Sequence, residues 1–270
     1  MKIGAVLAVL SLVASTAMAQ AESLKVAVTT SFHNSGLADV LLPEIQKDLG
    51  LTVQLLVVGT GQALRLGAAG DVDAILVHSK ASEEKFIADG HGTHRREIMF
   101  NDFVIVGPSG DPALVSAAET ADEALVAIAQ TQSAFVSRGD DSGTHKKELA
   151  LWAGAGVDAE ARAAVWYKEA GAGMGAALNT ASGLNAYIMS DRASWLKFGN
   201  KGDLALLYAG DPALFNQYAY LPVNPVTHPH VQAELAEKLE AWLISDRARA
   251  LIDGYTLEGG RLFIFNAQKH

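Results

Sequence analysis

The sequence contains no cysteine among its 270 residues. This absence excludes disulfide bonds, thiolate metal sites and a lipid-modified N-terminal cysteine. Basic residues are also scarce, because 21 Lys and Arg stand against 30 Asp and Glu and give a formal charge of −9. An acidic chain is poorly suited to bind nucleic acid or an anionic membrane surface. We therefore expect neither as a partner.

Long hydrophobic runs are missing after the first 20 residues. At the start, Lys2 precedes an apolar run from residue 3 to residue 13, and Ala17-Met18-Ala19 or Ala19-Gln20-Ala21 follows as a small-residue cleavage site. This pattern predicts a secretory signal peptide over residues 1–21, cleaved near Ala19 or Ala21. The run is too short to span a membrane, so we expect an exported, soluble mature protein.

Strand-like and helix-like patterns alternate along the rest of the chain. The predicted strands cover residues 24–28, 53–58, 74–77, 103–106 and 218–223, and the predicted helices cover 36–48, 120–130, 144–153, 174–189 and 232–245. Such alternation indicates an α/β fold with largely parallel sheets.

Three polar loops follow predicted strands, at residues 29–31, 59–61 and 137–145. Ligands of open α/β sheets bind beyond the carboxyl ends of the strands. If the chain crosses into a second lobe and returns, these loops face each other across a cleft. For residues 29–31 alone, plain capping of a helix N-terminus is the competing interpretation.

The third loop, Ser137-Arg138-Gly139-Asp140-Asp141-Ser142-Gly143-Thr144-His145, is the most informative. The planar guanidinium of Arg138 suits paired oxygens, and Asp140 is placed to hold it. Ser142 to Thr144 supply donors at the start of a helix, where the helix dipole also favours an anion. The loop therefore predicts a site for a compact oxyanion. A capped helix beside a surface ion pair is the structural alternative.

Other motifs are weaker. His91 and His94 lie three residues apart, but two imidazoles without a third ligand seldom hold a metal, so we expect a solvated turn. His78 follows an apolar strand and is interpreted as a structural histidine. Ser142 with a distant histidine leaves open a secreted hydrolase of phosphate esters, although no Gly-x-Ser-x-Gly motif is present.

These motifs resemble the periplasmic tungstate-binding proteins of ABC importers, which are relatives of the molybdate- and phosphate-binding proteins. The resemblance runs over nearly the whole mature chain. It is carried by residues 29–31, 35–37, 42–43, 58–64, 70–73, 77–78, 101–108, 137–148, 173–175, 191–192 and 223–225. The chain departs from the family pattern at Val28, where a threonine is common, and at His33-Asn34, where Tyr-Asp is common.

The resemblance implies a two-lobed, type II-like periplasmic binding protein with two chain crossings and its ligand in the cleft between lobes. Residues 22–105 plus 219–270 would form the first lobe and residues 106–218 the second. It also implies a monomeric periplasmic protein that delivers tungstate or molybdate to a membrane permease, with no enzymatic activity, cofactor or protein-ligated metal cation.

Tungstate and molybdate are fully deprotonated at neutral pH, so their site should offer donors alone. The expected oxyanion contacts come from both lobes: Thr30, Ser31 and Thr60 on one side, and Arg138, Ser142, Gly143 and Thr144 on the other, with Asp140 behind Arg138. Phosphate carries a proton and needs an acceptor as well, for which Asp39, Asp71 and Asp73 are the candidates. The sequence does not separate tungstate from molybdate.

Overall fold

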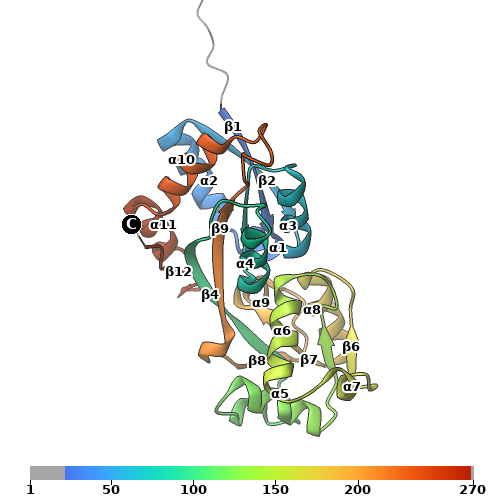
Figure 1. Cartoon of the computed structure of the whole chain (residues 1–270). Helices are drawn as coiled ribbons and strands as arrows, with labels where there is room; N and C mark the ends of the chain where they lie inside the picture. The colour runs from blue at the N-terminus through green and yellow to red at the C-terminus, as the bar shows by residue number, and fades with distance from the viewer. Residues whose placement is uncertain (1–21, 269–270) are drawn as a thin grey trace, which may run out of the picture.

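The computed structural model of the chain describes residues 22–268, so the predicted signal peptide lies outside the described residues. Helices and strands gather into two lobes, and two long strands run between them (Figure 1). The expected two-lobed α/β architecture is thus confirmed.

The first lobe is built from both ends of the described chain, coloured blue and red in Figure 1. Its elements are β1 (Glu22–Thr29), α1 (Thr30–Ser35), α2 (Leu37–Leu49), β2 (Leu51–Val58), α3 (Thr60–Ala69), β3 (Ala74–Val77), α4 (Lys80–Ala88), α10 (Ala233–Leu243), α11 (Asp246–Gly254), β10 (Thr256–Leu257), β11 (Gly260–Arg261) and β12 (Ile264–Phe265).

The second lobe is built from the middle of the chain, coloured green and yellow in Figure 1. It contains η1 (Val115–Ala117), α5 (Ala121–Gln130), β5 (Phe135–Ser137), α6 (Gly143–Gly154), α7 (Ala159–Arg162), β6 (Tyr167–Glu169), α8 (Met174–Leu184), β7 (Tyr187–Asp191), α9 (Arg192–Lys197), β8 (Leu204–Tyr208) and η2 (Pro212–Leu214). The connecting strands are β4 (Arg96–Pro108) and β9 (Phe215–Pro222).

Within residues 22–268, one ten-stranded sheet runs through both lobes in the order β2-β1-β3-β9-β4-β7-β5-β6, with β8 and β12 also paired to β4. The expectation of largely parallel sheets is wrong. β1 is parallel to β2 and β3, and β5 to β6 and β7, but every pairing of β4 and β9 is antiparallel. The reason is the course of the chain. β4 runs from the first lobe into the second and β9 runs back, so the two strands are antiparallel to each other, and each also pairs with strands that run in the opposite direction.

In the first lobe, β1 separates two apolar layers. Leu24, Val26 and Val28 point to a core shared with α2, α10 and α11, whereas Ala27 points to a core shared with α3 and α4. Because alternate side chains of a strand face opposite sides of its sheet, this run of buried residues needs helices on both faces. The result is a helix–sheet–helix sandwich.

The second lobe repeats this arrangement. Phe103, Phe135 and Met189 pack against α5 and α6, and Val104, Val136 and Ile188 pack against α8 and α9 on the other face. At the centre of the first of these cores lies Trp152, whose indole N–H donates to Glu148 Oε1 at 3.1 Å.

The helix predicted over residues 174–189 ends earlier. α8 stops at Leu184, Asn185 takes a left-handed conformation at φ 49°, and Tyr187–Asp191 forms β7. Asparagine tolerates this conformation and often terminates helices. The next five side chains are all buried, as expected for a strand covered on both faces. Other predicted elements agree with the structure to within a few residues, except that β4 is much longer than the predicted strand at 103–106.

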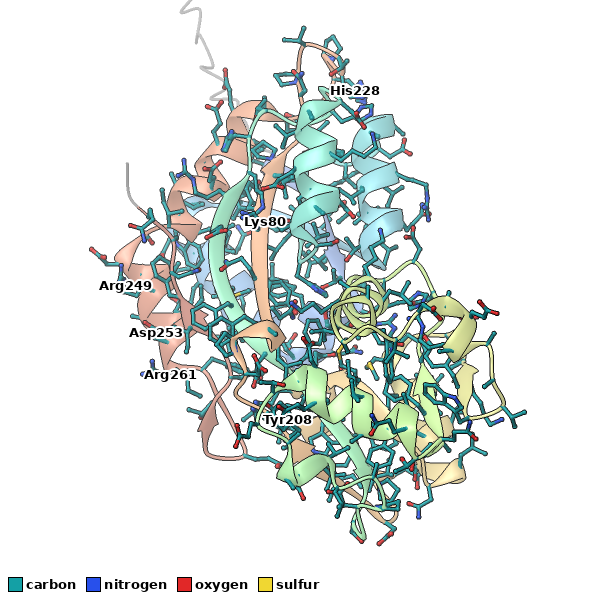
Figure 2. The ribbon with its side chains drawn as sticks, turned by 60° about the horizontal axis from the view of Figure 1, so that its bottom comes forward. Lys80, Tyr208, His228, Arg249, Asp253 and Arg261 are labelled. Carbon is teal, nitrogen blue, oxygen red and sulfur yellow. The ribbon has the colours of Figure 1, made fainter. Side chains whose placement is uncertain are left out.

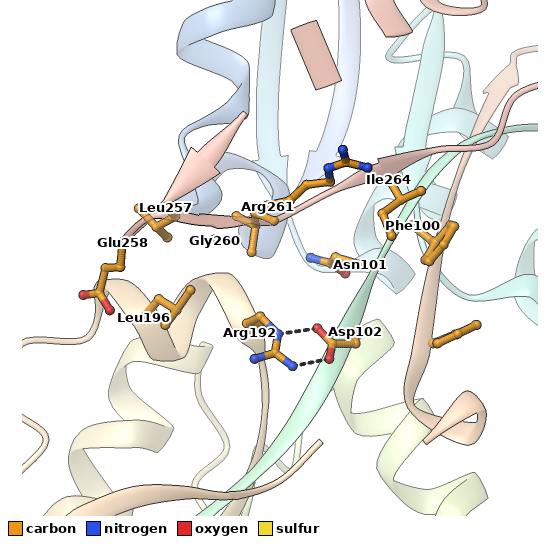
Figure 3. Close-up of a pocket in the computed structure, with 12 residues that line it drawn as sticks. Phe100, Asn101, Asp102, Arg192, Leu196, Leu257, Glu258, Gly260, Arg261 and Ile264 are labelled. Carbon is orange, nitrogen blue, oxygen red and sulfur yellow. Dashed lines mark hydrogen bonds and ion pairs between the residues drawn. The ribbon is translucent and has the colours of Figure 1, made fainter. Parts of the chain in front are cut away.

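β4 joins the lobes by changing its partners along its length. Residues Arg96 to Asp102 pair with β9, and Phe103 to Val106 pair with β7. At the change, Arg192 donates from Nε to Asp102 Oδ1 at 2.7 Å and from Nη2 to Oδ2 at 2.5 Å (Figure 3). This bidentate pair fastens the start of α9 to the connecting strand.

None of the helices in the described part of the chain is both long and apolar enough to cross a membrane. Residues 22–268 also contain no group of three or more histidine and carboxylate side chains that could hold a metal ion.

Truncation of the largest core side chain of the second lobe tests its packing. We expect Trp152→Ala to lower the free energy of unfolding by about 3–5 kcal/mol, because it empties a buried site and removes a donor from Glu148. The matched control is Val165→Ala, at a side chain that is 86% exposed, which should change stability by less than about 0.5 kcal/mol. Urea unfolding of the mature protein measures both. A loss below about 1 kcal/mol for Trp152→Ala would contradict the described core.

Candidate functional site

The loops after β2 and β5 meet across the gap between the lobes. The N–H of Gly61 donates to the carbonyl of Asp141 at 3.1 Å, and Arg65 Nη1 lies 2.8 Å from Asp141 Oδ2. The N-termini of α3 and α6 are therefore brought together, one from each lobe. Their unpaired N–H groups and dipoles favour negative charge at this place.

Gly143, the first residue of α6, lies in close contact with the first lobe. A Cβ added there would lie 2.7 Å from ring atoms of His78 and 2.9 Å from Thr60 Oγ1. Real Cβ atoms do not approach other atoms so closely, so this contact requires glycine. Gly143 thus lets the backbone of one lobe reach the side chains of the other.

In the first lobe, Ser31 is the centre of a buried hydroxyl cluster. Its Oγ lies 3.0 Å from Thr29 Oγ1, 3.0 Å from His78 Nε2 and 3.1 Å from the hydroxyl of Tyr218. Thr29 caps α1 by accepting from the Phe32 N–H, so capping describes Thr29 but not Ser31. Thr30 opens α1 and is only partly buried.

In the second lobe, Arg138 is 3% exposed and donates from Nη2 to Asp140 Oδ2 at 2.6 Å. Asp140 Oδ1 accepts from the Ser142 N–H at 3.2 Å, and Ser142 Oγ caps α6 by accepting from the His145 N–H at 3.1 Å. The loop is therefore held by its own side chains. Both the guanidinium and the start of α6 are fixed relative to β5.

Of the twelve buried side-chain polar atoms without a hydrogen-bond partner among residues 22–268, five belong to residues of this place: Thr60 Oγ1, His78 Nδ1, Arg138 Nε, Thr144 Oγ1 and Asp191 Oδ2. Buried polar groups are nearly always paired in folded proteins. Such a cluster therefore marks a ligand site rather than a packed core. Apart from Asp191 and the histidine nitrogen, its members are donors, as an oxyanion needs.

Val28 is the last residue but one of β1, and its side chain lies in the first-lobe core at 1% exposure. The position at which the resemblance predicted a threonine thus belongs to the strand. Its apolar side chain takes no donor away from the cluster between the lobes.

A basic recess leads to the cluster. A cavity of about 550 Å³ is lined by His78 and Gly143 and by Lys80, Lys146 and Lys147, with no carboxylate in its lining. Lys80 stands at the start of α4 in the first lobe (Figure 2), and the other two lysines stand on α6. Lys80 and Lys146 pair with Glu84 and Asp141, which lie outside the lining. The recess thus brings three ammonium groups next to the cluster although the chain is acidic.

Three residues of the cluster are absent from the sequence-based site. His78 follows β3 directly, so the rule that located the other strand-end loops could have found it. Asp191 ends β7, a strand concealed by the predicted helix at 174–189. Tyr218 lies inside β9 and carries no sequence signal, because only the antiparallel return of β9 places it beside Ser31.

The competing interpretations find little support. Ser142 accepts a backbone N–H, and no histidine ring within the described residues bonds to it. Asp73 accepts from the N–H groups of Lys25 and Gln232, while Asp39 and Asp71 do not join the cluster. His94 Nε2 lies 2.7 Å from a carboxylate oxygen of Glu240, and the ring of His91 packs on Phe86. The two histidines therefore do not form a metal pair.

His78 is held neutral by its surroundings. Burial, together with the charge of Arg138, lowers its pKa from 6.5 to about 3. A neutral imidazole adds no positive charge to that of Arg138. A group with so low a pKa is also a poor general base at neutral pH, so the Ser31–His78 pair is not suited to nucleophilic catalysis.

The depressed pKa of His78 predicts a pH-dependent stability. Between about pH 6.5 and pH 3, His78 is protonated in the unfolded chain but not in the folded chain. Because the unfolded state binds more protons in this range, the free energy of unfolding decreases as the pH falls. We expect the stability difference between the protein and His78→Gln to shrink below pH 6.5, by up to about 1.4 kcal/mol per pH unit. Urea unfolding from pH 7 to about pH 4 measures it. A constant difference would show that His78 titrates normally.

Comparison with known proteins places the chain in a family. A model described as a PBP superfamily domain matches residues 14–247. The tungstate-binding protein TupA of Peptoclostridium acidaminophilum is 45% identical over 251 residues, which cover 92% of this chain and 87% of that protein.

Solved structures agree. The tungstate-binding protein TupA from Desulfovibrio alaskensis G20 has a TM-score of 0.80 at 42% identity, covering 92% of this chain and 100% of that chain. A structure described as the tungstate ABC transporter from Geobacter sulfurreducens has a TM-score of 0.80 at 48% identity, with coverage of 87% and 99%. The chain therefore belongs to the PBP superfamily and, within it, to the family of the TupA proteins.

Proposed function

We propose that this protein is the substrate-binding component of an ABC importer and captures tungstate, or molybdate, for delivery to a membrane permease. The observation that supports this most directly is the cluster of unpaired buried donors from Thr60, Arg138 and Thr144 where the lobes meet. A tetrahedral dianion has four acceptor oxygens and matches such a set. The TupA relatives are named for binding the same ion.

In this proposal Ser31 and Thr60, with Thr30 at the rim, contact the anion from the first lobe. Arg138, Ser142, Gly143 and Thr144 contact it from the second, and Asp140 orients Arg138. The Ser142 hydroxyl has its proton left to donate, since it only accepts from His145. Closure of the lobes excludes water, which strengthens each of these interactions.

We further propose lobe boundaries at 105/106 and 218/219, close to the change of partners along β4. The protein is proposed to be exported to the periplasm after removal of residues 1–21 and to act as a monomer. The two lobes supply every group of the cluster, so a second copy is not required for binding.

Phosphate is the second candidate ligand, and one observation favours it. Asp191 brings a carboxylate to the cluster, and a protonated oxyanion needs such an acceptor. The names of the relatives favour tungstate.

Thermal melting of the anion-stripped mature protein distinguishes these ligands. Tungstate, molybdate, phosphate and sulfate are added in turn. A ligand present at about 1,000 times its Kd stabilises the folded state by about 4 kcal/mol, which raises Tm by roughly 8 °C or more in a chain of this size. We expect this shift with tungstate or molybdate and none with sulfate. A shift with phosphate alone would move the assignment to phosphate uptake, and no shift with any anion would reopen the hydrolase interpretation.

Replacement of the buried arginine tests the assigned contact. We expect Arg138→Ala to weaken tungstate binding by at least about 1.5–3 kcal/mol, the scale of a charged hydrogen bond. Isothermal titration measures the change in Kd. The control is Arg247→Ala on α11, an arginine that is 46% exposed and pairs with Glu44, which should leave Kd unchanged. Equal affinities for Arg138→Ala and the parent protein would refute the role of Arg138.

A further inference from the structure

Asp191 is a buried carboxylate that the proposed contacts leave unexplained. It ends β7 and is 0% exposed. Its Oδ1 accepts from the N–H of Ser194 at 2.9 Å and so caps α9, but Oδ2 has no partner among residues 22–268. An ionised oxygen buried without a partner is strongly unfavourable. The cap alone accounts for only one of its two oxygens.

The position of Asp191 ties it to the anion cluster. β7 runs parallel to β5, with Val136 opposite Ile188, so Asp191 lies at the same edge of the sheet as the start of the loop that carries Arg138. The charge of Arg138 acts on Asp191, and the charge of Asp191 acts on Tyr218. Tyr218 bonds to Ser31, which bonds to His78. Asp191 therefore adds the end of β7 to the strand ends that meet at the cluster.

The buried charges at this place disfavour a second carboxylate beside a bound dianion. Asp140 already balances Arg138 across 2.6 Å, so an ionised Asp191 leaves one net negative charge. A dianion would raise the total to three negative charges in a closed, poorly solvated space, where repulsion is strong. A neutral carboxyl removes this repulsion and turns Oδ2 from an acceptor into a donor.

We propose that Asp191 takes up one proton from solvent when the oxyanion binds and donates its Oδ2–H to an oxygen of the anion. The proposal rests on the proposed function, because it assigns a role within the same site. The step balances as carboxylate, dianion and one solvent proton giving a neutral carboxyl hydrogen-bonded to the dianion. Affinity and proton uptake are then coupled.

Burial raises the pKa of Asp191 above its ordinary value, although the N–H and the hydroxyl of Ser194 and the charge of Arg138 act to lower it. A bound dianion would raise this pKa further. The elements packed around it carry the following other titratable groups: Arg138 and Asp140 in the β5–α6 loop, His145, Lys146, Lys147 and Glu148 on α6, His78 after β3, Tyr218 on β9, Asp102 on β4, Arg192 and Lys197 on α9, and His33 on α1. The pKa of His78, about 3, and that of Tyr218, far above neutral, keep both groups neutral at physiological pH.

Calorimetric titration with sodium tungstate tests the coupling in the intact mature protein. At each pH from about 6.5 to 8.5, two buffers of different ionisation enthalpy report the number of protons exchanged. We expect uptake approaching one proton per anion, and a Kd that rises up to about tenfold per pH unit above the pKa of Asp191 in the free protein.

Asp191→Asn provides the matched variant. Its carbonyl oxygen can still cap α9, and its NH₂ donates at every pH. We expect it to bind tungstate without proton uptake and with a Kd that does not change with pH. The control is Asp111→Asn, a buried carboxylate elsewhere in the second lobe that accepts from the N–H groups of Val115 and Ser116. This control should keep the proton uptake of the parent protein.

Tungstate binding by the parent protein without proton uptake, or with proton release, overturns the assignment of Asp191 alone. The same holds if Asp191→Asn binds with the pH dependence of the parent. If the parent protein does not bind tungstate at any pH, the proposed function itself fails. Proton uptake by the parent protein tests the role of Asp191 even if Asp191→Asn does not fold.

Discussion

The burial of the Arg138 guanidinium is the constraint on which the surrounding structure depends. Taking such an ion out of water costs several kcal/mol unless charged and hydrogen-bonding partners surround it. Asp140 supplies one partner and is itself held by the N–H of Ser142. The hydroxyl of Ser142 fixes the start of α6, and Glu148 binds that helix to Ser137 on β5. The loop, the helix and the strand thus hold the guanidinium in one place. The Nε of Arg138 has no hydrogen-bond partner among the described residues and is available to an anion.

In the proposed function, the division of the donors between the lobes links anion binding to closure of the lobes. Thr60 and Ser31 belong to one lobe and Arg138 and Thr144 to the other, and Gly143 lets their backbones approach. An anion that contacts both sets binds the closed arrangement better than the open one, so it shifts the population toward closure by that difference in affinity. The bidentate Arg192–Asp102 pair joins the start of α9 to the connecting strand β4.

Local chemistry was readable from the sequence, whereas long-range pairing was not. The strand-end loops at 59–61 and 137–145 could be found because parallel strands place their carboxyl ends at one edge. The antiparallel course of β4 and β9 depends on contacts between residues more than a hundred positions apart, which no local pattern encodes. Tyr218 was therefore hidden, and Asp191 was hidden because a run of buried apolar residues at 187–189 fits a helix as well as a strand.

An excess of acidic residues is compatible with anion capture because charge acts locally. At physiological ionic strength, exposed charges more than about 8 Å apart are largely screened, so the overall charge of −9 says little about a site closed between two lobes. What an incoming anion meets is the recess with Lys80, Lys146 and Lys147, and then one guanidinium and the ends of two helices. Within the cluster, the charge of Asp140 balances that of Arg138. An ionised Asp191 would therefore give these three side chains a net negative charge. In our proposal, the protonation of Asp191 therefore affects the affinity for a dianion more than the acidic residues of the surface do.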